Sequence, residues 1–308
     1  MKKRRTGRGV ALVVLALIVA IGAAFWARPL AVFGVFSEAR MSLLGAQSRF
    51  TVVDGIRIHY YALGPANGPA VVLVHGLGGR SEDWKKLAPY VAKAGYRVYL
   101  PDLPGYGRSQ RPVNFSYSVT DESNVVVGLL DVLGLKQVDL GGWSMGGWIV
   151  QLVAAKHPER VHRLMLFDSA GLYVKPGWDT SLFTPVSVAQ LDKLDALLMP
   201  NPPQVPGFVA RDILRTSREH AWVIRRALST MLQGHETTDD LLPRLRMPVL
   251  IVWGAVDHIT PLNEGEKMHQ LIPQSQMDVV PACGHLAPNE CAAQIGPGVV
   301  SFLKSSAK

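Results

Sequence analysis

The sequence predicts an α/β protein whose mainly parallel sheet has helices on both faces, a helical lid over one end, and an N-terminal transmembrane helix. Three observations lead to this fold class. From residue 49 onward, short apolar segments alternate with segments of helical periodicity, which is typical of a parallel sheet covered on both faces. Residues 170–247 interrupt this alternation with helical segments and no convincing strand. Residues 9–27 contain no charged residue.

These observations divide the chain into consecutive parts. We expect a basic tip (1–8), a transmembrane anchor (9–27), a juxtamembrane linker (28–48), a core in two segments (49–169 and 248–308) and a helical lid (170–247). At 308 residues with 48% hydrophobic content, the chain is long and apolar enough to bury a large core, and it is not a disordered protein.

The positive charge is concentrated at the N-terminus. Five basic residues lie within positions 1–8, so they supply five of the net +8 and leave +3 for the remainder. No basic stripe follows, and the composition therefore argues against a nucleic-acid-binding protein.

The segment 9–27 is 19 residues long, and at about 1.5 Å per residue a helix of this length approaches the ~30 Å hydrocarbon core of a bilayer. Phe25 and Trp26 lie where aromatic anchors are found, and the apolar segment 30–36 suits a stretch lying on the bilayer. A cleaved signal peptide, with small residues at 22–24, is the alternative. The basic tip favours a cytoplasmic N-terminus and a main domain outside the cytoplasm, or a secreted domain if the segment is cleaved.

The core elements follow in order. Residues 50–53 and 56–62 flank Asp54-Gly55 and predict a hairpin. The apolar run 70–74 predicts a strand buried on both faces. Helical periodicity predicts a helix over 81–93, and a capping pattern starts another over 118–133. The remaining expected strands are 97–100, 138–140, 161–167, 248–253 and 276–280, and the remaining expected helices are 147–156, 188–198, 208–232, 261–271 and 289–303.

Residues 142–146 read Gly-Trp-Ser-Met-Gly and lie between an expected strand and an expected helix. This is the context of a nucleophile elbow, a sharp turn that holds Ser144 clear of the backbone while the flanking glycines avoid collisions. A serine hydroxyl needs a base to remove its proton, and a histidine base needs a carboxylate to orient it.

Among nine histidines, His285 is the one in a loop after the last expected strand, from which it could reach Ser144. Asp257 follows the strand 248–253 and is the preferred carboxylate. Asp168, which follows the strand 161–167, is the rival, and it could instead cap the entrance to the lid.

The reaction would create an oxyanion that needs two donors. We expect the backbone amide of Met145 and that of Leu77, in the glycine-rich loop after strand 70–74, to supply them. His75 is interpreted as a structural residue that holds this loop. The two cysteines, Cys283 and Cys291, provide no metal spacing. We expect them to be small buried residues, and a disulfide between them is the alternative if the domain lies in an oxidising compartment. No metal and no cofactor are expected.

With these motifs in place, residues 49–305 resemble the α/β-hydrolase family. The shared motifs are His-Gly at 75–76, the loop 102–109, the elbow, Trp-Gly at 253–254 with Asp257, and Gly-His at 284–285. The resemblance implies the chain order Ser, Asp, His and a site-shaping role for the loop 102–109, in which Asp102 is not a second catalytic acid.

Within that family, the chain looks most like membrane-anchored monoacylglycerol lipases and esterases. The expected function is a lipase or serine esterase that cleaves carboxylic esters, acylglycerols or other lipid esters, through an acyl-enzyme on Ser144. Its expected partners are a small-molecule ester and, through the N-terminal helix, a membrane, with no nucleic acid. Alternatives are a carbon–carbon bond hydrolase acting on a vinylogous diketone, a cofactor-free perhydrolase, and a non-catalytic receptor for a hydrophobic ligand.

Overall fold

A computed structural model describes the backbone of residues 3–305 and the side chains of residues 12–305. The side chains of the predicted basic tip and the end of the predicted core, 306–308, lie outside the described residues. Within them, eight strands form one sheet in the order β1-β2-β4-β3-β5-β6-β7-β8. The strands are β1 (Gln47–Val53), β2 (Ile56–Leu63), β3 (Ala70–Val74), β4 (Arg97–Pro101), β5 (Val138–Trp143), β6 (Val161–Phe167), β7 (Val249–Gly254) and β8 (Gln276–Val280).

The sheet is mainly parallel, as predicted. β2 runs antiparallel to both β1 and β4, and the other neighbouring pairs are parallel. The β1–β2 hairpin turns at Asp54 and Gly55, which have φ of 48° and 79°. Positive φ at both positions matches the twist of a tight hairpin. The central strands β3 and β7 are almost entirely buried because helices cover both faces.

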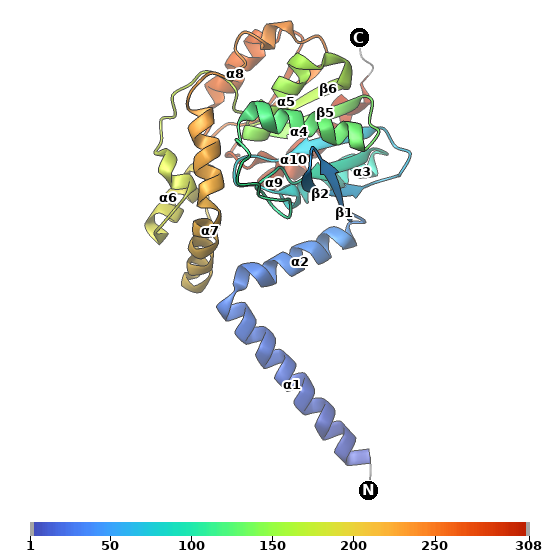
Figure 1. The fold of residues 1–308 in the computed structure, drawn as a ribbon, viewed down its shortest axis with the longest axis vertical. Coiled ribbons are helices and arrows are strands. Elements are labelled where there is room, and N and C mark those ends of the chain that lie inside the picture. The colour runs from blue at the N-terminus through green and yellow to red at the C-terminus, as the bar shows by residue number, and fades with distance from the viewer. Residues whose placement is uncertain (1–2, 306–308) are drawn as a thin grey trace.

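One face of the sheet is covered by α4 (Val119–Val132), α5 (Met145–Lys156) and α8 (Leu262–Leu271), whose apolar side chains share one core cluster. The other face is covered by α3 (Ala88–Lys93), α9 (Ala287–Glu290) and α10 (Ala292–Lys304). Figure 1 shows this layered arrangement.

Two predicted helices are interrupted. The segment 81–93 is a 3-10 turn, η1 (Ser81–Trp84), followed by α3, which begins with Pro89 in its first turn. The segment 289–303 is divided at Cys291 into α9 and α10. Proline lacks the amide proton that a continuous helix needs, which explains the new helix start at α3.

The predicted lid contains helices and no strand among its residues, all of which are described. Its main helices, α6 (Val188–Leu198) and α7 (Gly207–Met231), lie beside the core in Figure 1. Short 3-10 turns, η3 (Thr180–Phe183) and η4 (Leu242–Arg244), flank them, and a third, η2 (Pro158–Arg160), precedes β6.

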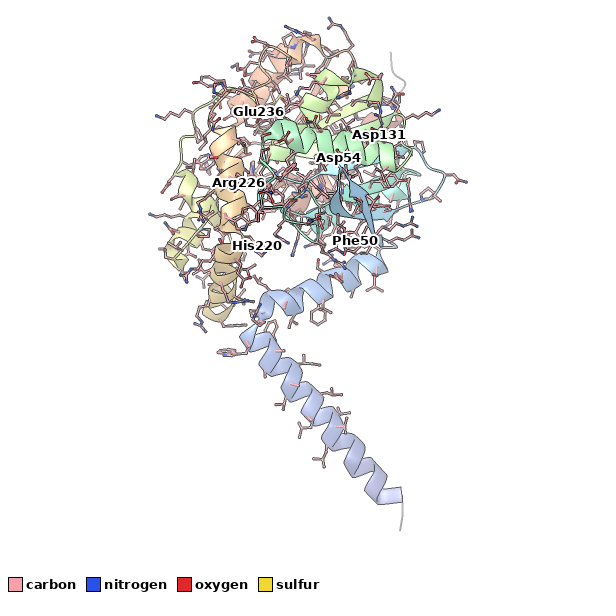
Figure 2. All side chains as sticks on the ribbon, in the orientation of Figure 1. Phe50, Asp54, Asp131, His220, Arg226 and Glu236 are labelled. Atoms are coloured by element: carbon pink, nitrogen blue, oxygen red, sulfur yellow. A yellow bond between two sulfur atoms is a disulfide. The ribbon has the colours of Figure 1, made fainter. Side chains whose placement is uncertain are left out.

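Two polar side chains, Arg226 and Glu236, attach the lid to the core (Figure 2). Arg226 donates to the carbonyls of Val113 and Phe115, and Glu236 accepts from the first amides of α4. Polar contacts, as well as apolar packing, therefore attach the lid to the segment before α4 and to the start of that helix.

The N-terminal region forms α1 (Lys3–Ala27) and α2 (Pro29–Leu43), and α1 projects away from the rest of the molecule (Figure 1). Arg28, before Pro29, leaves the helical conformation (φ −141°, ψ 62°), because a residue that precedes proline is disfavoured there. Among the described helices none is by itself long and apolar enough to cross a membrane. Leu12–Ala27 and Pro29–Leu43 meet that requirement together, with a bend of 111° between them.

A small set of contacts, which we call the clasp, joins these helices to the lid helix α7. Trp26 stacks on Phe208 with ring centroids 4.7 Å apart. The Leu30 amide donates to Asp212 Oδ2 at 2.9 Å, and Arg28 lies 3.8 Å from the same carboxylate. The Asp212 side chain is 2% exposed, so the polar part of the clasp, between α2 and the lid, is centred on a buried carboxylate.

Candidate active site

Ser144 lies at a sharp turn between β5 and α5, with φ of 56° and ψ of −121°. A Cβ at Gly142 would lie 2.2 Å from the Gly146 carbonyl oxygen, and one at Gly146 would lie 2.3 Å from that of Val74. Only glycine fits at both positions. The turn is therefore a nucleophile elbow, as its sequence predicts.

The three predicted triad residues lie together in one hydrogen-bonded chain. Ser144 Oγ is 2.9 Å from His285 Nε2, and His285 Nδ1 is 2.7 Å from Asp257 Oδ2. All three residues are buried, with exposed fractions of 9% or less. This is the geometry in which an imidazole can remove a proton from a serine while a carboxylate fixes its tautomer.

Asp257 is itself fixed by its own loop. Its Oδ1 accepts hydrogen bonds from the amides of Ile259 (2.7 Å) and Thr260 (3.0 Å), and the Thr260 hydroxyl lies 2.8 Å from Oδ2. These contacts leave Oδ2 directed at His285. Thr260 is a site residue that the sequence analysis did not identify.

Asp168, the rival carboxylate, is not bonded to His285. Its Oδ1 accepts from the Gly254 amide (2.7 Å) and its Oδ2 from the Ala287 amide (3.2 Å). Burial and the neighbouring Asp257 carboxylate raise the pKa of Asp168 well above its usual value. Asp168, which follows β6, thus binds the end of β7 and the start of α9, and it does not cap the lid entrance.

The two predicted oxyanion donors lie next to Ser144: Met145 follows it in the chain, and a Cβ at Gly76, which precedes Leu77, would lie 3.0 Å from the Ser144 Cβ. Neither the Leu77 amide nor the Met145 amide donates to an acceptor within residues 3–305, and Met145 opens helix α5. Leu77 lines the cavities that contain Ser144. Two unpaired amides, one of them at a helix N-terminus, are the donors that a developing oxyanion needs.

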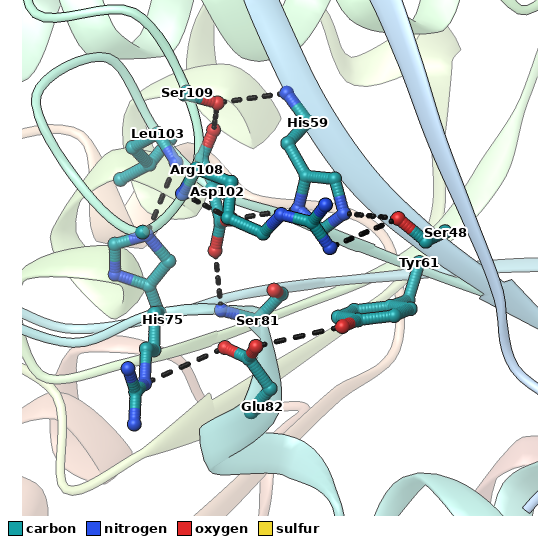
Figure 3. Close-up of polar contacts among 12 residues, drawn as sticks. Ser48, His59, Tyr61, His75, Ser81, Glu82, Asp102, Leu103, Arg108 and Ser109 are labelled. Carbon is teal, nitrogen blue, oxygen red and sulfur yellow. Dashed lines mark hydrogen bonds and ion pairs between the residues drawn. The ribbon is translucent and has the colours of Figure 1, made fainter. Parts of the chain in front are cut away.

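A buried polar network, shown in Figure 3, holds the loops around these donors. His75 Nε2 accepts from the Leu103 amide at 3.0 Å, and its Nδ1 lies 2.8 Å from the Gly76 carbonyl oxygen. Burial lowers the pKa of His75, which fits a neutral ring that accepts one bond and donates the other. The predicted structural role of His75 agrees with these contacts.

Asp102 is the centre of the same network (Figure 3). It accepts from the amides of Ser81 (2.7 Å) and Arg108 (2.9 Å) and lies 2.7 Å from His59 Nδ1. Burial alone would raise the pKa of Asp102, but these hydrogen bonds outweigh it and lower that pKa. Asp102 ties the loop 102–109 to the loop that carries Leu77, and it does not contact the triad.

The His285 loop is closed by a disulfide between Cys283 and Cys291. The expectation that these cysteines are unpaired was wrong. Both flank the short helix α9, and the break at Cys291 brings its side chain back to Cys283. The loop is further held by Trp143, whose indole nitrogen donates to the His285 carbonyl at 2.7 Å, and by the His285 amide, which donates to Leu198 of the lid at 2.9 Å.

Two cavities meet at Ser144, Leu77 and Phe183. The first cavity, of about 630 Å³, is also lined by His285 and Leu286, by leucines of α6, and by Leu30 of α2. The second cavity, of about 560 Å³, is also lined by apolar residues and one carboxyl group: Trp148, Leu172, Leu228, Met231, Ile259 and Glu264.

Among the large apolar residues of the lid, Phe183 lines both cavities, whereas Leu182 is buried beside it. Phe208 belongs to the clasp, and Trp222 packs edge-on against Tyr117. Glu264 was not anticipated as a site residue because it lies in an amphipathic helix, where a lone glutamate suggests a solvated position.

Comparisons with known proteins agree with this geometry. The model of the alpha/beta hydrolase fold family matches residues 69–222 and 233–290. A 2-hydroxy-6-oxononadienedioate/2-hydroxy-6-oxononatrienedioate hydrolase of Cupriavidus pinatubonensis is 30% identical over 276 residues, which cover 83% of this chain and 95% of that protein. Lipase 1 of Psychrobacter immobilis is 27% identical, covering 82% of each.

Among solved structures, one described as a membrane phospholipase A, a bacterial virulence factor, is similar with a TM-score of 0.81 and 26% identity. The match covers 97% of this chain and 100% of that one. The family match, the relative at 30% identity and the shared fold lead to one conclusion: this chain belongs to the α/β-hydrolase family.

Proposed function

We propose that this protein is a serine hydrolase that cleaves carboxylic esters, with Ser144 as nucleophile, His285 as general acid and base, and Asp257 as the residue that orients His285. The observation that carries the proposal is the chain of contacts from Ser144 Oγ to His285 Nε2 (2.9 Å) and from His285 Nδ1 to Asp257 (2.7 Å). In this mechanism the serine oxygen attacks the acyl carbonyl and its proton passes to His285 Nε2.

The oxyanion that forms then accepts hydrogen bonds from the Leu77 and Met145 amides. His285 returns the proton to the leaving alcohol, which departs and leaves an acyl-enzyme on Ser144. A water molecule attacks this ester with His285 as base, and the serine is regenerated. The described residues supply each of these roles without a metal ion or cofactor in the scheme.

The two cavities suit the two halves of an ester. The leaving oxygen must be close to His285 Nε2 to receive a proton. His285 and Leu286 line the first cavity and are not among the residues that line the second. We therefore assign the alcohol part to the first cavity and the acyl chain to the second, where Trp148, Leu228 and Met231 provide an apolar wall.

We assign the substrate class to acylglycerols or other lipid esters. The combined volume of the cavities suits an amphipathic molecule, and Leu30 of α2 lines the first cavity. The apolar side chains of α1 from Leu12 onward are largely exposed, for example Leu12 at 67% and Val19 at 62%, which supports their burial in a lipid phase. The similarity to a lipase and to a membrane phospholipase A points in the same direction.

We also propose that the N-terminal helices attach the protein to a membrane and that the catalytic domain is outside the cytoplasm. The charge-free segment after a basic tip supports this orientation. The disulfide between Cys283 and Cys291 supports it independently, since disulfides persist in oxidising compartments. Protease treatment of spheroplasts tests the orientation, because a catalytic domain outside the cytoplasm should be digested while the cytoplasmic membrane is intact. A domain left untouched would contradict the proposal.

Carbon–carbon bond hydrolysis is the second candidate. It is supported by the similarity to the Cupriavidus pinatubonensis hydrolase, since the match covers 95% of that protein. Arg80 and Arg111 line the first cavity and provide positive charge for the carboxylate of such a substrate. A substrate panel decides between the two. The ester proposal expects purified protein to hydrolyse p-nitrophenyl and monoacylglycerol esters, and Ser144→Ala to abolish this activity. Turnover of a vinylogous diketone with no ester hydrolysis would replace it by the second candidate.

A further inference from the structure

The second cavity contains one carboxyl group that the proposed reaction does not use. Glu264 lies in the first turn of α8, is 9% exposed, and lines this cavity together with Ser144. Its side chain forms no hydrogen bond and no ion pair with any residue that the structure describes. Its carboxyl oxygens are not fully buried but open onto the cavity, where water can solvate them. A ligand that displaces this water must replace its hydrogen bonds, because a carboxyl group left without a partner costs free energy.

The other groups near Glu264 do not satisfy it. The Thr260 hydroxyl lies between Asp257 Oδ2 and the Asp168 carbonyl and is occupied there. Lys267, one turn further along α8, is paired with Asp239 at 2.9 Å. Lys175 and Tyr173 also line the cavity, but both are exposed to solvent.

Glu264 also has an unusual ionisation. Burial, together with the nearby Asp257 carboxylate, raises the pKa of Glu264 to about 7, and Lys267 opposes this shift. At neutral pH the group is therefore divided between its charged and neutral forms. Both forms can accept a hydrogen bond through an oxygen.

We propose that Glu264 is a specificity residue that accepts a hydrogen bond from a hydroxyl group on the acyl chain of the substrate. The inference rests on the proposed ester hydrolysis and on the assignment of the acyl chain to the second cavity. The preferred substrates are then esters of hydroxyacyl chains, because a plain acyl chain would cover Glu264 without offering it a partner.

A hydroxyl fits this position better than a charged group does. A carboxylate on the acyl chain would be repelled by ionised Glu264 and by Asp257. An ammonium group would lose its hydration among Trp148, Leu228 and Met231, where a single counter-charge of mixed ionisation compensates poorly. A hydroxyl carries no charge and needs one acceptor, which Glu264 provides.

The test compares p-nitrophenyl octanoate with a series of p-nitrophenyl hydroxyoctanoates in which the hydroxyl moves along the chain. The measured quantity is the ratio of kcat/KM for each hydroxy ester to that for the plain ester. In the wild type we expect at least one position to give a ratio of about ten or more, the factor expected for one hydrogen bond to a buried carboxylate. Glu264→Leu should reduce the ratio to about one or below, and Glu264→Gln should keep part of it.

Glu266→Gln is the matched control, since Glu266 is an exposed residue of the same helix, and it should leave the ratio unchanged. The ratio in the wild type should rise from pH 5.5 to pH 8.5 as Glu264 ionises and becomes the stronger acceptor, and it should stay flat in Glu264→Gln. A purely structural role for Glu264 would slow all esters equally and leave the ratio independent of pH.

The inference is overturned if no hydroxy ester is preferred by the wild type, or if Glu264→Leu keeps the preference. Thermal unfolding identifies a variant that fails to fold, and Glu264→Gln, which is nearly isosteric, then carries the comparison. Ser144-dependent hydrolysis of the plain ester without any hydroxyl preference would remove this inference alone. Absence of all ester hydrolysis would remove the proposed function, and this inference with it.

Discussion

Replacing Asp257 by asparagine tests the role of the carboxylate without changing the size of the side chain. The amides of Ile259 and Thr260 can only donate, and they lie 2.7 and 3.0 Å from Oδ1. They will therefore select the orientation in which the asparagine carbonyl replaces Oδ1. The NH2 group then occupies the place of Oδ2, which is 2.7 Å from His285 Nδ1.

This orientation forces the wrong tautomer on His285. Since the NH2 group donates, Nδ1 must accept, and the ring proton moves to Nε2. Ser144 Oγ, 2.9 Å away, then faces an N–H group instead of a lone pair, and its proton cannot be removed. In other serine hydrolases a change of this kind lowers kcat by about 10⁴-fold, which corresponds to about 5 kcal/mol of activation free energy. We expect a fall of that size here.

The assay is steady-state hydrolysis of p-nitrophenyl octanoate by the wild type, Asp257→Asn and Asp168→Asn. Asp168 makes no contact with His285, so Asp168→Asn should keep kcat within about tenfold while lowering stability, because an NH2 group would then face an amide donor. A folded Asp257→Asn protein that retains more than a few per cent of kcat would show that the Asp257 carboxylate does not fix the tautomer of His285. Loss of activity in Asp168→Asn alone would transfer the role to Asp168.

Three further predictions concern stability and the clasp. Replacing Cys283 and Cys291 by serine opens a loop with a sequence separation of 8, which should lower the free energy of unfolding by about 2.5 kcal/mol. Denaturant titration measures this change, and an unchanged midpoint would contradict a stabilising role of the disulfide. The pKa of Glu264 is raised from 4.5 to about 7, so the folded state holds this proton more tightly than the unfolded state does. The free energy of unfolding of the wild type, relative to that of Glu264→Gln, should therefore fall by at most about 3 kcal/mol as pH rises from 4.5 through 7. A pH-independent difference in their unfolding midpoints would show that Glu264 is solvated. Asp212→Ala removes the acceptor of the Leu30 amide, so hydrogen exchange at Leu30 should become about tenfold faster or more, and unchanged protection would mean that the clasp does not hold α2.

Much of the fold could be predicted because its signals are local. The strands β3 and β7 are wholly apolar, and a strand of that kind is covered on both faces in a parallel sheet. Ser144 and His285 were found for a related reason. Each follows a strand, and the carboxyl ends of parallel strands meet at one edge of the sheet.

The missed features depend on contacts that the order of residues does not encode. Pairing of Cys283 with Cys291 requires the break between α9 and α10, which the helical periodicity of that segment conceals. Thr260 is recognised as a site residue only by its position beside Asp257. Glu264 is recognised only because the first turn of α8 lines the second cavity. In sequence, both have the appearance of ordinary polar residues near the start of a helix.

The N-terminal region illustrates a different limit. Composition alone suggests one continuous apolar span followed by a linker, but Pro29 ends the first helix and starts a second. The direction of the second helix is set by its contacts with α7, through Leu30 and Asp212, which are 182 residues apart. No local pattern predicts a contact at that separation.

The proposed mechanism depends most directly on a covalent acyl intermediate at Ser144. Rapid acid quenching of the wild type during hydrolysis of p-nitrophenyl octanoate, followed by mass spectrometry of its peptides, tests this claim. We predict an octanoyl group on the peptide that contains Ser144 and no such adduct in Ser144→Ala. An adduct on another residue, or full hydrolysis by Ser144→Ala, would contradict the proposed mechanism.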